Sequence, residues 1–264
     1  MKAPPPLQPL LGPAGLAALA ALMDHAPLLA FDFDGTLAPI VPHPADARIA
    51  PAVATRLARL AARLPVAIVT GRALADVRPL LGFAPHYVVG NHGAEDEHVH
   101  DQTLHSRAAL GGLRRKLARR AAELADAGVL LEDKGASIAL HYRQAPDAAR
   151  ALALIERLLR PTTRALRVFG GKMVVNAMAA DAPDKALAVL RLVQRSGAGA
   201  ALFAGDDLND EPVFAAAPPH WLTVRVGLPA APQPPSLARF ALDGPEDMAQ
   251  MLDQLLALLG DAMA

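Results

Sequence analysis

Two aspartates, Asp32 and Asp34, stand at the end of an apolar run of strand length that begins at Leu28. Side chains alternate along a strand, so the two carboxylates would share one side if the extended geometry continued, and Gly35 lets the backbone turn just past them. Neighbouring carboxylates repel each other, which is costly unless a divalent cation or a catalytic task offsets the repulsion. A buried strand followed by an ordinary Asp-Gly turn is the alternative.

Two further segments carry residue types that suit a phosphate site. The apolar run 66–69 is followed by Thr70 and Gly71, and a hydroxyl beside open backbone N–H groups can hold a phosphate oxygen. A strand-to-helix turn capped by Thr is the alternative. Lys185 follows Pro183, which suits an early helix position, so this cation would stand near a helix start. A solvated surface lysine is the alternative there.

An acidic segment completes the set. The apolar run 201–204 ends in Gly205, and four acidic residues follow within a few positions: Asp206, Asp207, Asp210 and Glu211. A hard cation such as Mg²⁺ prefers oxygen ligands of this kind. An acidic turn facing solvent would explain the acids, but not their place directly after a strand of buried type.

These four segments together resemble a known set of motifs. DFDGTL at 32–37, VTGR at 69–72, the downstream Lys185 and GDDLNDE at 205–211 are similar to the four motifs of the haloacid-dehalogenase superfamily of phosphotransferases. Three intervening segments, at 90–95, 132–143 and 170–176, resemble those of the trehalose-6-phosphate phosphatase family. The likeness runs from about residue 27 to the C-terminal helical pattern and so covers most of the chain.

The resemblance implies an activity and a cofactor. The expected reaction is Mg²⁺-dependent hydrolysis of trehalose 6-phosphate to trehalose and phosphate, through an aspartyl-phosphate intermediate, as a step of trehalose biosynthesis. Asp32 is the implied nucleophile and Asp34 the implied general acid and base, while Thr70 and Lys185 would offset charge on the phosphoryl oxygens. The implied metal ligands are Asp32, the Asp34 backbone carbonyl and Asp206, with Asp207 and Asp210 behind them.

The same resemblance implies a set of substrate-binding residues. These are Gly71, Arg72, His92, Glu95, Lys134, Arg143, Lys172 and Asn176. Glu95 matches a motif residue that is expected to contact the substrate. Lys134 and Lys172 stand beside turn-forming glycines and could reach anionic or polyol groups, with plain surface charges as the alternative. His92 has no partner histidine at ligand spacing, so a positioning or structural role is preferred to metal binding.

Two positions depart from the family pattern. Asn176 stands where the family usually has Glu, a residue expected to hydrogen-bond a sugar hydroxyl, and Asn keeps an acceptor but loses the charge. Asn209 replaces the usual Thr and matches the GDxxND pattern of many sugar-phosphate phosphatases. A phosphatase for another sugar phosphate, of the sucrose or glucosylglycerol type, is therefore the alternative, and a phosphosugar-binding sensor is a weaker one, because a sensor needs no nucleophile.

Composition excludes several other classes of protein. The 264 residues include 26 basic and 26 acidic side chains, and this balance argues against broad binding to nucleic acid or to an anionic membrane. The chain has no cysteine, which excludes disulfides, a thiolate nucleophile and a cysteine zinc site. The expected partner is a small phosphosugar, with trehalose-6-phosphate synthase as the candidate protein partner from the same pathway.

The N-terminal segment, residues 1–26, resembles a signal peptide only superficially. The run Leu7–Leu22 is apolar, but Lys2 is its only basic residue at the front, and Pro9 and Pro13 interrupt it. We expect a disordered Pro-rich tip followed by a short helix over 14–23, and a cytoplasmic protein. No other segment offers the roughly 18 uninterrupted apolar residues of a membrane span.

The pattern of elements predicts an α/β fold with a Rossmann-like parallel sheet core and an inserted α+β cap domain. Strand-like runs at 28–33, 66–70, 86–90 and 200–204 alternate with helical patterns at 50–64, 73–81 and 183–196. Ligands bind beyond the carboxyl ends of such strands, so Asp32, Thr70, Lys185 and Asp206 should converge there.

A change of pattern marks the expected cap, residues 101–177, between core segments 27–100 and 178–264. Its predicted elements are an Arg-rich helix at 110–124, strands near 129–132 and 136–143, a helix at 147–159, and strands near 165–169 and 172–176. The arginines of the first helix, Arg114, Arg115, Arg119 and Arg120, are interpreted as a solvated face.

Overall fold

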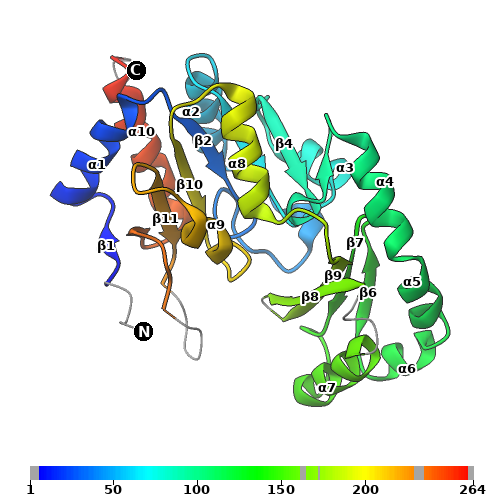
Figure 1. Ribbon diagram of the computed structural model, residues 1–264. Coiled ribbons are helices and arrows are strands. Elements are labelled where there is room, and N and C mark those ends of the chain that lie inside the picture. The colour runs from blue at the N-terminus through cyan, green and yellow to red at the C-terminus, as the bar shows by residue number, and fades with distance from the viewer. Residues whose placement is uncertain (1–5, 161–164, 172, 229–234, 261–264) are drawn as a thin grey trace.

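The computed structural model describes residues 6–160, 165–171, 173–228 and 235–260, which form two β-sheets (Figure 1). The larger sheet holds β1 (Gln8–Pro9), β2 (Leu28–Phe31), β3 (Val66–Val69), β4 (Tyr87–Gly90), β5 (Glu95–Asp96), β10 (Ala201–Gly205), β11 (Leu222–Val226) and β12 (Phe240–Leu242). Its order is β1-β12-β11-β10-β2-β3-β4-β5, and every neighbouring pair is parallel except β4–β5. The expected mixed α/β fold with a mostly parallel sheet is confirmed.

Strand β2 lies at the centre of this sheet. Phe31 pairs with Ala204 of β10 on one side and with Ile68 of β3 on the other, so the three carboxyl ends lie at one edge. Every residue of these three strands is buried. Burial on both faces explains why their sequences are continuous apolar runs and do not alternate.

Helices cover both faces of the larger sheet. α1 (Pro13–Met23), α2 (Pro51–Ala61) and α10 (Met248–Leu258) pack against one another, whereas α8 (Lys185–Ser196) lies on β2 and β3 with the short α9 (Glu211–Ala216) beside it (Figure 1). α2 shows why such helices form. Pro51 occupies its first turn, and Val53, Leu57 and Leu60 recur at helical spacing to give one buried stripe.

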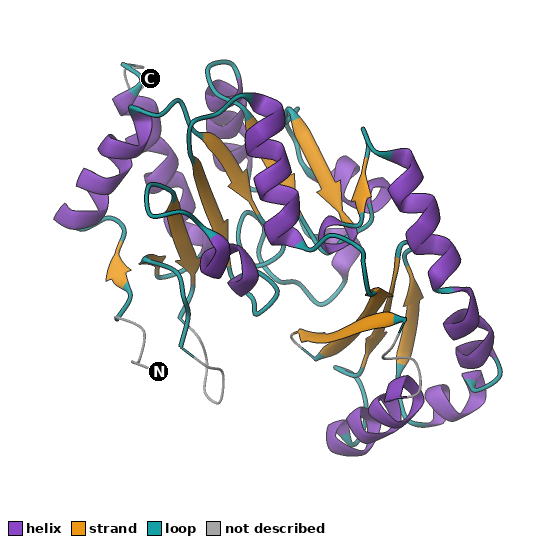
Figure 2. Ribbon diagram, viewed as in Figure 1, coloured by secondary structure: helices purple, strands orange, loops and turns teal. Residues whose placement is uncertain are grey.

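The smaller sheet belongs to the segment between β5 and α8. Its antiparallel strands, in the order β6-β7-β9-β8, are β6 (Leu130–Asp133), β7 (Ser137–His141), β8 (Leu166–Gly171) and β9 (Val174–Ala179). The helices α4 (His100–Ala109), α5 (Gly111–Ala118), α6 (Ala121–Asp126) and α7 (Ala148–Leu159) accompany it (Figure 2). Leu117, Ile138 and Ile155 lie in a hydrophobic cluster of its own. We propose that this segment is the cap that was expected at residues 101–177.

The single helix expected at 110–124 is wrong. Two helices, α5 and α6, meet at Arg119 and Arg120, and α4 was not predicted at all. The break turns the chain so that Leu117 of α5 and Leu124 of α6 both face the hydrophobic cluster. The arginine face is only partly solvated, because Arg114 makes a two-bonded ion pair with Asp133 at 2.6 and 3.0 Å.

The N-terminal segment contributes to the larger sheet. Residues 1–5 lie outside the described part of the chain, but Gln8–Pro9 form β1 on the edge of the sheet, and Leu10 is fully buried. A proline is tolerated there because an edge strand leaves one side of its backbone unpaired. The expected disordered tip is therefore wrong for residues 8–10, while the predicted helix over 14–23 is confirmed as α1. Among the described residues, no helix has the length and apolarity needed to cross a lipid bilayer.

Candidate active site

Three buried carboxylates meet at the carboxyl edge of the larger sheet. Asp32 follows β2, Asp206 follows β10, and Asp210 immediately precedes α9. One oxygen from each lies within 4.8 Å of the others. Because β2 and β10 are neighbours in register, the first two carboxylates are brought together by the pairing of the strands themselves.

Lys185 balances part of this negative charge. It is the first residue of α8, whose start is capped by Asp184 accepting a hydrogen bond from the Leu187 N–H at 2.9 Å. Its Nζ lies 2.7 Å from Asp210 Oδ1 and 3.0 Å from Asp32 Oδ2, and only 1% of its side chain is exposed. Burial alone would lower the pKa of Lys185, but the two carboxylates outweigh it and raise the pKa, so the ammonium form is held.

The charges around Asp32 favour the binding of a cation. Burial raises the pKa of Asp32 well above its ordinary value, Asp210 and Asp206 raise it further, and Lys185 lowers it. Three carboxylates thus face one ammonium group, a deficit of positive charge that a divalent cation would offset. Buried carboxylate oxygens drawn from separate elements are the donor set that Mg²⁺ prefers, so the residues present fit a Mg²⁺ ion.

Two glycines allow the carboxylates to approach so closely. Gly35 has a φ of +79°, and a Cβ built on it would lie 2.1 Å from Asp206 Oδ2. A Cβ on Gly205 would lie 2.3 Å from the carboxyl carbon of Asp210. Any side chain at either position would displace a carboxylate of the cluster.

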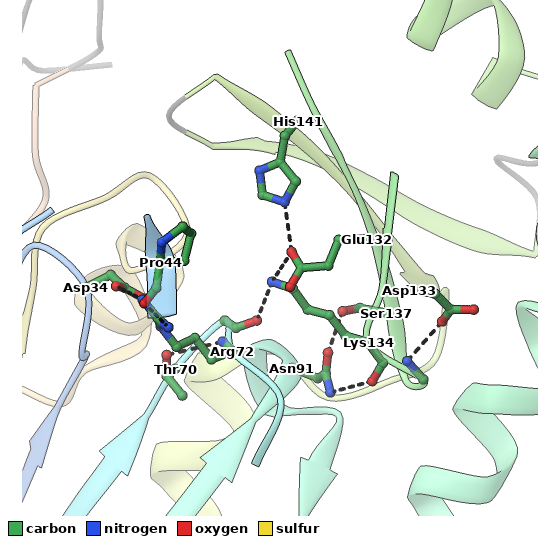
Figure 3. Close-up of polar contacts among 12 residues, drawn as sticks. Asp34, Pro44, Thr70, Arg72, Asn91, Glu132, Asp133, Lys134, Ser137 and His141 are labelled. Atoms are coloured by element: carbon green, nitrogen blue, oxygen red, sulfur yellow. Dashed lines mark hydrogen bonds and ion pairs between the residues drawn. The ribbon is translucent and has the colours of Figure 1, made fainter. Parts of the chain in front are cut away.

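Asp34 does not join the three clustered carboxylates through its side chain. Arg72, in the loop after β3, donates from Nε to Asp34 Oδ2 at 2.7 Å and from Nη2 to Asp34 Oδ1 at 2.6 Å (Figure 3). Thr70 is buried at the end of β3, where its hydroxyl accepts from the Arg72 N–H at 3.2 Å. Arg72, which was predicted to bind substrate, therefore has two of its nitrogens engaged by a predicted catalytic group.

Asp207 supports the cluster from the loop before α9. Its backbone N–H donates to Asp210 Oδ2 at 3.0 Å, and its Oδ2 accepts from Asn209 Nδ2 at 3.0 Å. Asp207 Oδ1 is buried without a hydrogen-bond partner among the described residues. This oxygen is an acceptor that a donor from outside the described residues would satisfy.

The smaller sheet reaches the site through Lys134. Its Nζ donates to the Gly71 carbonyl at 3.0 Å and lies 3.5 Å from Glu132 Oε2, which in turn is 2.8 Å from His141 Nε2 (Figure 3). Asn91 adds a second connection, because its Nδ2 donates to the Lys134 carbonyl at 3.2 Å. Lys134 is therefore placed between the two sheets, as a substrate-contacting residue of a cap would be.

Glu95 is engaged within the core. Its Oε2 accepts from the Leu74 N–H at 2.9 Å and from Asn91 Nδ2 at 2.7 Å. The first bond satisfies a backbone N–H in the first turn of α3 (Leu74–Val77). The residue at the N-cap position makes no side-chain hydrogen bond to that turn. The predicted contact between Glu95 and substrate stays a prediction.

His92 and Asn176 are buried together where the two sheets meet. Burial, and after it the charges of Lys185, Lys134 and Arg167, lower the pKa of His92 well below 6.5, whereas Asn176 raises it only slightly. The His92 ring packs edge-on against Phe169 at 5.0 Å, and a Cβ on Gly71 would lie 2.4 Å from it. A neutral, tightly packed imidazole is suited to positioning, and the positioning role expected for His92 stays a prediction.

Of the remaining predicted residues, Arg143 is exposed in the turn after β7, and Lys172 lies outside the described residues. Conversely, Glu132 and Asn91 take part in the interface between the sheets but were not predicted as site residues. The signal for Glu132 was available, since it stands two positions before Lys134 and therefore on the same side of the chain.

The mostly parallel sheet with the carboxylate cluster at its edge has the fold of haloacid-dehalogenase-like hydrolases. A haloacid dehalogenase-like hydrolase from Bacteroides thetaiotaomicron superposes with a TM-score of 0.60 at 14% identity, over 87% of this chain and 99% of that one. The C-terminal domain of the Candida albicans trehalose-6-phosphate phosphatase superposes with a TM-score of 0.75 at 23% identity, over 99% and 100% of the two chains.

The sequence itself narrows this class to one family. The model of the family described as Trehalose-phosphatase matches residues 30–246, and the chain belongs to that family. The trehalose-phosphate phosphatase of Mycobacterium tuberculosis (strain H37Rv) is 34% identical over 251 residues, which are 91% of this chain. The chain spans 64% of the length of that relative.

Proposed function

We propose that the protein hydrolyses trehalose 6-phosphate to trehalose and phosphate. The observation that carries the proposal is the buried Asp32–Asp206–Asp210 cluster with Lys185 at 2.7 and 3.0 Å, in a chain of the trehalose-phosphatase family. Membership of the family supports a phosphosugar substrate. The cluster supports phosphoryl transfer, because a plain sugar-binding protein has no use for a nucleophile held beside buried counter-charges.

The proposed reaction has two steps. An Asp32 oxygen attacks phosphorus, the bond from phosphorus to the sugar oxygen breaks, and Asp34 gives a proton to that leaving oxygen. Asp34 then takes a proton from the water that attacks the aspartyl phosphate, which releases phosphate and frees Asp32. Lys185 and the Thr70 hydroxyl stabilise the negative charge on the phosphoryl oxygens throughout.

The proposed cofactor is Mg²⁺. Asp32, Asp206 and the Asp34 carbonyl would hold it, with Asp210 and Asp207 alongside. A bound Mg²⁺ would supply Lewis-acid stabilisation of the phosphoryl oxygens. Asp210 lies closer to the proposed metal ligands than its predicted place behind them, because it belongs to the carboxylate cluster and also contacts Lys185 directly.

The proposed sugar site lies between the two sheets. Lys134 reaches across from the smaller sheet, and Asn176 is buried beside His92 at the same interface. Glu95 is joined to this group through Asn91. A disaccharide bound here would meet charged and amide groups from both sheets, which is the chemistry that polyol recognition needs. A place in the cytoplasm and an association with trehalose-6-phosphate synthase stay predictions.

Release of phosphate from a panel of sugar phosphates tests the proposal. We expect trehalose 6-phosphate to be hydrolysed faster than sucrose 6-phosphate or glucose 6-phosphate. EDTA should abolish turnover, Mg²⁺ should restore it, and Ca²⁺ should restore it poorly, because its longer and looser coordination misplaces the attacking carboxylate. Faster hydrolysis of another sugar phosphate would transfer the proposal to that substrate, and full activity without metal would contradict the cofactor.

A further inference from the structure

The orientation of the Asp34 carboxylate depends on one neighbouring side chain. Asp34 lies in the turn after β2 with 39% of its side chain exposed, so few other groups confine it. Arg72 bonds both of its oxygens, at 2.6 and 2.7 Å, from the two nitrogens of one planar edge. A planar two-bonded contact fixes the rotation of a carboxylate as well as its position, which a single hydrogen bond does not.

The Arg72 side chain is itself firmly held. Its remaining terminal nitrogen, Nη1, donates to the Pro44 carbonyl at 2.8 Å, and its guanidinium carbon lies 5.1 Å from the centre of the Phe33 ring. The backbone is fixed as well, because its N–H donates to the Thr70 hydroxyl and its carbonyl accepts from the Asn91 N–H at 2.8 Å. Only 12% of the side chain is exposed.

These contacts argue against direct binding of substrate by Arg72. Arginine recognises a phosphate through two parallel N–H groups on one edge, and the Nε–Nη2 edge of Arg72 is engaged by Asp34. The Nη1 group points to a backbone carbonyl of the loop that follows Asp34. The guanidinium thus joins the loops after β2 and β3 and orders the first of them.

We infer that Arg72 is a positioning residue that holds Asp34 in the orientation required for proton transfer to the leaving oxygen. This inference rests on the proposed phosphatase reaction and gives Arg72 a role other than the predicted substrate contact. A misplaced general acid slows the chemical step, while the substrate still binds to other groups. Loss of Arg72 therefore lowers kcat and leaves KM nearly unchanged.

The leaving group provides a readout that separates this role from others. A sugar alkoxide is strongly basic and needs a proton as its bond to phosphorus breaks, whereas p-nitrophenolate leaves without one. The experiment measures kcat, KM and the single-turnover rate of leaving-group release for trehalose 6-phosphate and p-nitrophenyl phosphate in the unmodified protein, Arg72→Ala, Arg72→Lys and Asp34→Asn. The single-turnover rate reports the first step alone and excludes hydrolysis of the aspartyl phosphate. Lysine keeps the charge but cannot make the planar two-bonded contact.

We expect kcat for trehalose 6-phosphate to fall about 10- to 100-fold in both Arg72 variants, with KM changed less than about threefold. In a single turnover, release of p-nitrophenolate should barely change, although the later hydrolysis of the aspartyl phosphate, for which Asp34 is the proposed base with either ester, should slow. Asp34→Asn should likewise slow release of the sugar more than release of p-nitrophenolate, and its rate on trehalose 6-phosphate should fall by about 100- to 10,000-fold. Adding Arg72→Ala to Asp34→Asn should cost no further rate, because the first residue acts only through the second.

Arg56→Ala is the matched control. Arg56 makes the same two-bonded ion pair with Asp253, at 2.7 and 2.9 Å, between α2 and α10 and away from the site. Its loss should leave the ratio of the two substrates unchanged. Should Arg72→Ala fail to fold in a thermal unfolding check, Arg72→Lys carries the test.

Two results would overturn the inference. One is an equal loss in the single-turnover release of both leaving groups, or a raised KM with an unchanged kcat, since either would make Arg72 a phosphate or substrate contact. The other is an additive loss in the double variant. If the unmodified protein does not hydrolyse trehalose 6-phosphate but hydrolyses another alkyl phosphate, only the proposal about the substrate is wrong. The leaving-group comparison is then made with that alkyl phosphate. If it hydrolyses no phosphate ester, both proposals fail.

Discussion

Asp32 carries two opposed electrostatic demands. In the proposed reaction it must be ionised to attack phosphorus, yet burial and the carboxylates of Asp210 and Asp206 raise its pKa. Lys185 opposes them from 3.0 Å, and a cation held by the same carboxylates would add to its effect. The proposed nucleophile would therefore be activated by its neighbours and not by an intrinsic property of the aspartate.

Asp32→Asn should remove turnover and leave the fold intact. The amide is nearly isosteric and keeps an oxygen that can accept the Phe33 N–H, which Asp32 Oδ1 accepts at 2.7 Å, but it is far less nucleophilic. We expect a loss of more than about a thousandfold in kcat. Phosphate release and thermal unfolding are measured together, with Asp253→Asn as a control carboxylate outside the site. Near-normal turnover of Asp32→Asn would rule out the aspartyl-phosphate route.

His92 should make stability depend on pH. Burial lowers its pKa well below 6.5, so below that pH the unfolded chain binds a proton that the folded protein does not. The contribution of the neutral ring is complete above pH 6.5 and is lost as the pH falls, by up to about 1.4 kcal/mol per pH unit. His92 has a φ of +55°, which Asn tolerates better than most residues, so His92→Asn is the variant chosen. It should flatten the curve of unfolding free energy against pH.

Urea unfolding of both proteins between about pH 5 and pH 7 measures this slope. The comparison uses the pH dependence, because the lost ring contact with Phe169 also lowers the stability of the variant at every pH. Equal slopes in the two proteins would mean that folded His92 is protonated as readily as unfolded His92.

At the scale of elements, the turns after β2 and β10 determine whether the three clustered carboxylates can lie close together. Gly35 and Gly197 both have a positive φ, of +79° and +69°, but only the first has a neighbour within reach of a Cβ. The two glycines therefore separate the cost of a left-handed backbone from the cost of displacing a site residue. Gly197 ends α8, far along the helix from Lys185.

Gly35→Ala and Gly197→Ala should each lose about 1–2 kcal/mol of unfolding free energy, because L-residues disfavour positive φ. Only Gly35→Ala should also weaken Mg²⁺ binding, since its methyl group would overlap Asp206 Oδ2. Isothermal titration with Mg²⁺ and thermal unfolding report the two effects separately. Equal Mg²⁺ affinity in the two variants would show that Asp206 is not held by this turn.

Much of the sheet could be predicted because buried parallel strands are apolar throughout. The runs that end at Asp32, Thr70 and Asp206 showed this pattern, and the carboxyl ends of such strands share one edge. The run at 86–90, which contains β4, was predicted in the same way, whereas β1 and β12 had no comparable signal. β1 has two residues and β12 has three, so their existence depends on pairing with a neighbour more than on their own sequence.

The pairing of side chains between loops could not be predicted. Arg72 was expected to contact substrate and bonds Asp34 instead, and the Glu95 carboxylate bonds the Leu74 N–H. Each contact joins segments that come after different strands of the larger sheet, and the separation of these segments depends on the whole sheet. Local spacing identifies the residue types at a site, but it contains no information on which of them touch.

At the scale of the whole molecule, the two sheets touch at the loop that carries the phosphate-site residues. Lys134 of the smaller sheet donates to the carbonyl of Gly71, next to Thr70. A movement of the smaller sheet would therefore reach the proposed phosphate site through this hydrogen bond, and through Asn91, which bonds the Lys134 carbonyl. We propose that these contacts connect recognition of the sugar to the geometry of the chemistry.

Lys134→Ala should reduce kcat/KM for trehalose 6-phosphate about ten- to a hundredfold, the cost of leaving one polar partner unsatisfied in a closed site. The rate on p-nitrophenyl phosphate, which lacks the sugar, should fall much less. Lys116→Ala is the control, because Lys116 also donates to a backbone carbonyl, that of Leu158, but within the smaller sheet's own helices. An equal effect of Lys134→Ala on both substrates would show that Lys134 does not contribute to recognition of the sugar.

The central place of β2 has a consequence for the growing chain on the ribosome. Its partner β3 follows soon in the sequence, but β10 is made only after residues 32–200 have been added. At about 5–20 residues per second, one apolar edge of β2 stays unpaired for roughly 10–30 s. Such an edge can pair with another chain and aggregate. Ribosome-bound chains that stop before residue 200 should therefore be sensitive to protease and need chaperones, and chains that extend well past β10 should not.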